Sequence, residues 1–65
     1  MKTSTRDEID GQLYLAVSAL REARNLLLAE PEYTTPEAMV FFKESEKAIN
    51  LVHAATAQLF RLPTT

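Results

Sequence analysis

The sequence predicts an all-α fold, an antiparallel hairpin of two amphipathic helices that dimerises into a four-helix bundle. Two long stretches carry apolar residues at alternating steps of three and four, which is the spacing of one helix face. A proline-containing break separates stretches of similar length, and short connections are typical of antiparallel helix neighbours. We therefore expect a single domain over residues 1–65, with helices at 6–30 and 36–62, a loop at 31–35 and short polar tails.

The first predicted helix starts near Arg6, because Thr5 and Glu8 have the spacing of a capping box. Its apolar positions form a seam made of Ile9, Leu13, Ala16, Leu20, Ala23 and Leu27. Further apolar residues flank this seam on both sides, namely Val17, Leu28, Leu15, Ala19 and Leu26. The apolar arc then exceeds half of the helix circumference, whereas a surface helix needs a stripe of about 100°. We expect this helix to be covered from two sides.

The second predicted helix begins at Pro36, because Thr35-Pro36 combines a favourable N-cap residue with proline at the first helical position. Pro31 disfavours helical geometry at Glu30, and Pro63 ends the helix after Leu62. Its expected seam is Ala38, Phe41 or Phe42, Ser45, Ala48 or Ile49, Val52, Ala55 and Leu59. This helix also carries apolar residues on more than one side.

Chain length and composition indicate that one hairpin is half of the folded object. A chain of 65 residues builds a small core, and proteins of this size depend on disulfides, metals or oligomerisation. The sequence has no cysteine and one histidine, which excludes disulfides and the common zinc sites. We expect a homodimer, with no metal and no cofactor.

Several function classes are disfavoured by the residues present. The net charge is −2 and the basic residues are scattered, whereas nucleic-acid binding needs clustered positive charge. No apolar run approaches the roughly 20 residues that span a bilayer, and the N-terminal segment is polar, so we expect a cytoplasmic protein without membrane contact. The carboxylates spread around the helices and no nucleophile is paired with a base, so we expect no enzyme and no catalytic residue. His53 has no predicted role.

Residues 39–42 form the densest apolar group, and four consecutive helical residues cannot all face one core. This group serves as hairpin core, as dimer interface or as a partner site, and the sequence leaves these alternatives open. Tyr33 belongs to a residue type enriched at binding hot spots. The candidate residues for the dimer interface or for partner binding are Leu13, Val17, Leu20, Leu27, Tyr33, Met39, Val40, Phe41, Phe42, Ile49, Val52, Leu59 and Phe60.

These observations lead to one main hypothesis and two alternatives. The first is a small acidic interaction protein of the kind found in bacteria or phages, which binds a larger protein and modulates it as an inhibitor, adaptor or regulatory subunit. The second is a small dimeric DNA-binding regulator that uses the side chains of Lys43, Lys47, Asn50 and Gln58. The third is a purely structural oligomerisation module, which has no partner besides itself.

Overall fold

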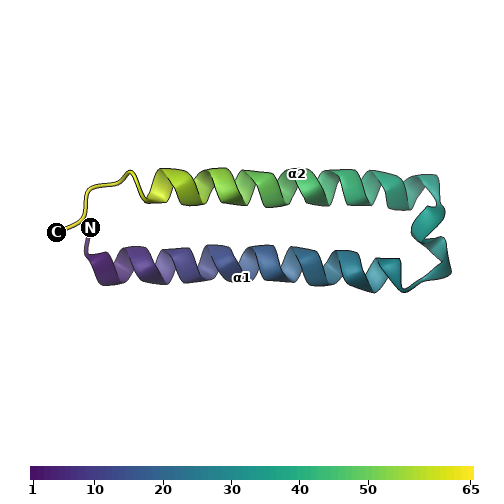
Figure 1. The fold of residues 1–65 in the computed structure, drawn as a ribbon, viewed down its shortest axis with the longest axis horizontal. Helices are drawn as coiled ribbons and strands as arrows, with labels where there is room; N and C mark the ends of the chain where they lie inside the picture. The colour runs from purple at the N-terminus through teal and green to yellow at the C-terminus, as the bar shows by residue number, and fades with distance from the viewer.

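Two long helices lie side by side in the computed structural model, which describes residues 1–65 (Figure 1). Helix α1 spans Thr3–Leu28, a short 3₁₀ helix η1 spans Pro31–Thr34, and helix α2 spans Pro36–Leu59. The two long helices run antiparallel, and both termini lie at the end opposite the turn. There the backbone N–H of Thr65 donates to the carbonyl oxygen of Met1 at 2.9 Å. The all-α prediction with two long helices is confirmed.

Helix α1 begins at Thr3, three residues before the predicted start. Lys2 is its N-cap residue, with extended backbone and no side-chain capping bond. Thr5 therefore lies inside the helix, and the predicted capping box is wrong. The residues between Lys2 and Arg6 include no proline or glycine, so the helix continues from Arg6 back to Thr3. The carbonyl oxygen of Lys2 accepts the first helical hydrogen bond, from the N–H of Arg6 at 3.1 Å.

The turn is built from two prolines and one threonine. Glu30, which precedes Pro31, has extended backbone with φ −99° and ψ 149° because the proline ring disfavours helical geometry there. The side-chain Oγ1 of Thr35 accepts from the backbone N–H of Ala38 at 3.2 Å and donates to the carbonyl oxygen of Glu32 at 2.8 Å. The predicted cap, with Pro36 at the first helical position, is confirmed.

Helix α2 ends at Leu59, three residues before the predicted end at Leu62. The N–H groups of Arg61 and Leu62 reach back three residues, to the carbonyl oxygens of Gln58 and Leu59 at 3.0 and 3.1 Å. These bonds form a tight turn in place of a further helical turn. The chain leaves the helix before Pro63 because the residues ahead of a proline avoid helical geometry.

The contact between the helices is narrow. Only five of 65 residues are buried, and these are Val17, Ala38, Ser45, Ile49 and Leu59. With half-buried residues at the same spacing they define the hairpin seam, which is Arg6, Asp10, Leu13, Val17, Leu20, Arg24 and Leu27 in α1 and Ala38, Phe42, Ser45, Ile49, Val52, Thr56 and Leu59 in α2. Ala48 is also half-buried and lies beside this seam. Each helix thus keeps the predicted alternation of three and four.

The contact with α2 takes up half of the predicted α1 seam. Leu13, Leu20 and Leu27 do face α2, but Ile9, Ala16 and Ala23 are exposed. The predicted α2 seam holds except that Thr56 takes the place of Ala55. The physical reason is the width of the apolar arc, since a single neighbouring helix covers one edge of it and leaves the other edge open.

Polar residues on the hairpin seam are accommodated locally. The hydroxyl of Ser45 donates to the carbonyl oxygen of Phe42 at 3.0 Å, and that of Thr56 donates to Val52 at 3.0 Å. Both hydroxyls are therefore satisfied within α2, and they need no partner from α1.

The hairpin is one helix thick. Its Cα atoms extend over 50 by 16 by 9 Å, and the view down the shortest axis shows both helices in one plane (Figure 1). Protein domains bury their apolar surface between two or more packed layers. This hairpin supplies one layer, so both of its broad faces are uncovered.

The Thr35 cap gives a first prediction. The Thr35→Ala variant loses the bond to the N–H of Ala38, and we expect its free energy of unfolding to fall by about 1 kcal/mol. Urea unfolding followed by circular dichroism measures this change. Thr34→Ala is the matched control, because Thr34 is exposed in η1 and makes no side-chain hydrogen bond, and equal losses in the two variants would contradict the assignment of the cap.

The position of the hairpin seam gives a second prediction. Val17 is 6% exposed, so Val17→Ala opens a cavity between the helices and lowers the free energy of unfolding by roughly 2 kcal/mol. Leu15 is 58% exposed, and Leu15→Ala should change the same quantity by less than about 0.5 kcal/mol. A larger loss at Leu15 than at Val17, measured by the same unfolding experiment, would place the seam elsewhere.

Candidate protein–protein interface

One broad side of the hairpin, which we term the apolar face, is lined by aliphatic and aromatic side chains from both helices. At about 100° per residue, Ile9, Ala16 and Ala23 follow one edge of the α1 seam, and Phe41, Ala48 and Ala55 follow the adjacent edge of the α2 seam. With the seam residues that these edges border, the apolar face comprises Ile9, Leu13, Ala16, Leu20, Ala23, Leu27, Phe41, Ala48, Val52, Ala55, Leu59 and Leu62. Charged side chains lie at its two ends, where Arg61 lines the hollow near the termini and Glu32 and Glu37 line the hollow near the turn.

Two shallow hollows lie on the apolar face, one near each end. At the terminal end, a hollow is lined mainly by Ile9, Leu13, Ala55, Leu59 and Leu62. At the turn end, the apolar lining of a second hollow is Leu27, Ala38 and Phe41. Large apolar side chains are strongly exposed beside these hollows, with Ile9 39%, Phe41 40% and Leu62 52% exposed. A contiguous exposed apolar surface of this extent is typical of a protein–protein contact.

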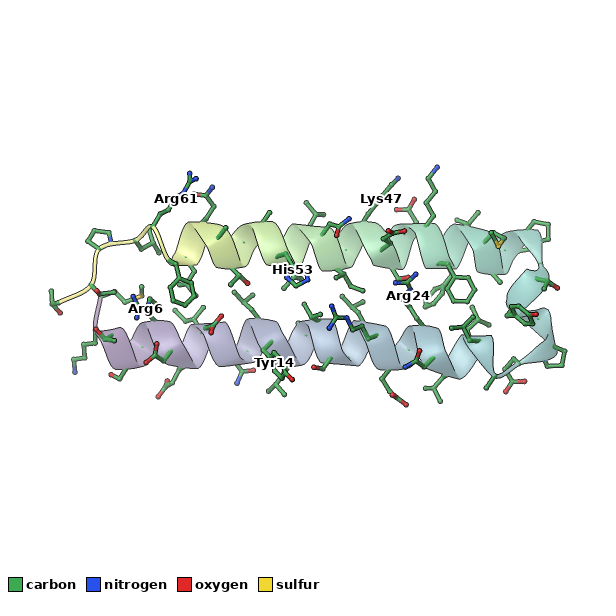
Figure 2. The ribbon with its side chains drawn as sticks, in the orientation of Figure 1. Arg6, Tyr14, Arg24, Lys47, His53 and Arg61 are labelled. Carbon is green, nitrogen blue, oxygen red and sulfur yellow. The ribbon has the colours of Figure 1, made fainter.

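The opposite side of the hairpin, which we term the polar face, carries charged and aromatic residues. One hollow between the helices is lined by Asp10, Leu13, Tyr14, Val17, Arg21, His53 and Thr56, and a second by Arg21, Arg24, Asn25, Leu28 and Phe42. Figure 2 shows Arg6, Arg24 and His53 between the two helices, while Lys47 and Arg61 point outward from α2. The two broad sides of the hairpin therefore differ in chemistry.

Two arginines cover aromatic rings along the hairpin seam. The guanidinium carbon of Arg6 lies 4.8 Å from the centroid of the Phe60 ring, and that of Arg24 lies 5.9 Å from the Phe42 ring. Arg6 also approaches the carboxylate of Asp7 at 3.7 Å, while its buried Nε makes no hydrogen bond. Both cations lie within the distance at which an arginine is attracted to an aromatic face, so they help to hold α1 against α2.

The structure divides the predicted interface residues into two groups. It brings together, between the helices, Leu13, Val17, Leu20, Leu27, Phe42, Ile49, Val52 and Leu59. It leaves exposed Tyr33, Met39, Val40, Phe41 and Phe60. The exposed group does not form one surface, because Tyr33 lies in η1 and the others point in several directions around α2.

The side chains of residues 39–42 point in different directions around α2, as the sequence indicates. Phe42 packs on the hairpin seam, while Phe41 lies on the apolar face at its edge, with the two ring centroids 5.9 Å apart and the rings inclined at 68°. Met39 and Val40 are each 60% exposed. By helical rotation Met39 lies toward the polar face and Val40 points away from α1.

Sequence reasoning missed the exposed members of the apolar face. Ala16 and Ala23 were listed in the α1 seam together with the residues that face α2, and Leu62 was named as the end of the second helix. The width of the apolar arc was the available signal, since it exceeds what one neighbour covers. Arg6 and Arg24 were also missed as seam residues, although their spacing to Asp10, Val17 and Leu27 follows the same three-four alternation.

The side chains proposed for DNA contact lie on the outer side of α2. Lys43, Asn50 and Gln58 are exposed there, and the Nζ of Lys47 binds the carboxylate of Glu44 at 3.3 Å. This ion pair offsets part of the positive charge on that side. The DNA-binding alternative stays a prediction.

Comparison of this chain with protein-family models, with curated proteins and with solved structures finds no match in any of the three. Neither helix has an apolar stretch long enough to cross a bilayer. No three side chains of the histidine, aspartate and glutamate type lie close enough together to hold a metal ion.

Proposed function

We propose that this chain is a protein–protein interaction module whose working form is a homodimer, in which two hairpins pack apolar face on apolar face as a four-helix bundle. The surface that remains outside the bundle binds a larger protein and modulates it, as an inhibitor, adaptor or regulatory subunit. The observation that carries the proposal is the open apolar face of a hairpin that is one helix thick.

The rotation of the two helices supports a four-helix bundle. In such a bundle each helix has two neighbours at roughly right angles, so its core-facing line lies about 45° from the direction of either neighbour. At about 100° per residue, the midline of the predicted α1 seam, from Ile9 to Leu27, lies about 50° from the line that faces α2. In α2, the midline of the residues on the apolar face lies at a similar angle from the line that faces α1. These angles are close to those that a bundle with a second pair of helices requires, which supports the proposal.

The size of the apolar face also suits a dimer. The hairpin measures 50 by 16 Å across its broad side. The rectangle spanned by its Cα atoms covers about 800 Å², which is large enough to seat an interface of standard size, in which each partner buries about 800 Å² of accessible surface. A second copy presents a face of the same dimensions and the same chemistry, as a two-fold symmetric contact requires.

The surface for a larger partner is proposed on the polar face. Tyr14 is 70% exposed and Met39 is 60% exposed, and Arg21 lies between the hollows of that face. Tyrosine, methionine and arginine are enriched in interface cores and at hot spots. A purely structural oligomerisation module would share the dimer and have no such partner.

The dimer is tested with Ala23→Glu, which puts a charge on the apolar face. In a lone hairpin Ala23 is exposed, so the substitution would be tolerated, whereas in the bundle it leaves a buried, unpaired carboxylate. We expect the parent to sediment at twice its 7.3 kDa at micromolar concentration and the variant to lose both the dimer and most of its helical circular dichroism.

Ala54→Glu is the matched control for this test, because Ala54 is exposed on the side of α2 away from the apolar face. It should sediment and unfold like the parent. A parent that sediments as a folded monomer, or an Ala23→Glu variant that behaves like the control, would refute the dimer.

The larger partner is tested by affinity capture from a lysate of the organism that encodes the chain. We expect the parent to retain one protein in stoichiometric amount, and the Tyr14→Ser, Met39→Ser double variant to retain at least roughly tenfold less, as the loss of hot-spot contacts implies. Leu15→Ser is the control, because Leu15 is exposed outside the polar face. If no protein is retained by a dimeric parent, the structural-module alternative is the better account.

A further inference from the structure

The two helices are in a fixed register along the apolar face. At the terminal end Ile9 and Leu13 line one hollow with Leu59 and Ala55, and at the turn end Leu27 lines another with Phe41. Because the helices run antiparallel, each step forward in α1 is a step back in α2. The same register places Ala16 beside Val52, Leu20 beside Ala48, and Ala23 beside Ser45.

Side-chain size varies along this register in a way that is not symmetric about the middle. Large residues occupy both ends, with Ile9 and Leu59 at one and Leu27 and Phe41 at the other. Near the turn, however, Ala23 and Ser45 form a level made of two small residues. The level equally far from the middle on the terminal side pairs Leu13 with Ala55, which is one large residue and one small.

We infer that the second copy packs with its turn at the opposite end of the bundle, so that the two-fold axis runs across the helices at the level of residues 18 and 50, next to Ala19 and Leu51. This inference rests on the proposed homodimer and specifies its arrangement. A two-fold axis that packs a face on its own copy either runs along the helices, with both turns at one end, or runs across them, with the turns at opposite ends.

The size pattern decides between the two arrangements. With both turns at one end, each level meets its own copy, and Ala23 and Ser45 meet Ala23 and Ser45 of the second copy. Four small side chains at one level leave a void, whereas protein interiors are close-packed. With the turns at opposite ends, Ala23 and Ser45 meet Leu13 and Ala55, so a leucine fills the space that the small residues leave.

The exposed Leu51 lies close to the proposed axis. It is 70% exposed, and it lies near the middle of α2 beside the apolar face. With the turns at opposite ends, α2 packs against α2 of the second copy, and Leu51 meets Leu51 next to the axis. The arrangement therefore buries an aliphatic side chain that the single hairpin leaves in water.

Single cysteines test this arrangement in a chain that has none of its own. Leu51→Cys and Ala19→Cys are each treated with a bis-maleimide whose spacer of about 8 Å matches the separation of packed helices. We expect each variant alone to form a covalent dimer at least roughly tenfold faster than Ala54→Cys, because thiols held together within one bundle react at a high effective concentration. Sedimentation of the reduced variants establishes that each is still a dimer.

A different cross-linking pattern overturns the arrangement. If both turns lie at one end, α1 packs against α2 of the second copy, and residue 19 meets residue 51. An equimolar mixture of the two variants would then cross-link rapidly, while each variant alone would react no faster than Ala54→Cys. That result leaves the proposed homodimer intact, whereas a parent that sediments as a monomer removes the homodimer and the arrangement together.

Discussion

The breadth of apolar surface on each helix is the constraint on which the rest of this structure depends. A helix with apolar side chains over more than half of its circumference cannot bury them against one neighbour. In this hairpin the contact takes one edge of the arc, around Val17 in α1 and Ile49 in α2, and it buries only five residues. The remaining edge of each arc is left uncovered by the other helix.

This division explains why the contact between the helices includes polar side chains. Asp10, Arg24 and Thr56 lie on the hairpin seam because the seam reaches the border of each apolar arc. Arginine side chains suit such a border, since their aliphatic stems pack against apolar groups while their charged ends reach aromatic rings or water. The polar face therefore carries the charged and aromatic side chains, and the apolar face carries the uncovered edge of each apolar arc.

Much of the fold could be predicted from the sequence because local rules determine it. Pro31 and Pro36 fix where the helices stop and start, and the hydroxyl of Thr35 caps α2 as expected. The start of α1 was wrong because a weak local signal, the pairing of Thr5 with Glu8, competes with a polar segment that is free to continue the helix. Capping and turn preferences therefore did not determine the first residue of α1.

The candidate interface was less predictable, because it depends on how far each helix rotates about its own axis. Periodicity placed Leu13, Leu20 and Leu27 in the α1 seam, but it could not separate these residues, which face α2, from Ala16 and Ala23 on the next edge of the arc. Rotation is set by the whole set of contacts between the helices, including the two arginines over aromatic rings. A single stripe of apolar residues does not contain that information.

The meeting of the two termini makes the chain nearly a ring. With the N–H of Thr65 bonded to the carbonyl oxygen of Met1, a short peptide could join the ends without moving either helix. Closing the chain would remove conformational freedom from the unfolded state, by about 4 kcal/mol for a loop of this length if the native geometry is unstrained. A closed chain could then be reopened between η1 and α2, and the order of the helices in the sequence would be exchanged while their packing stayed the same.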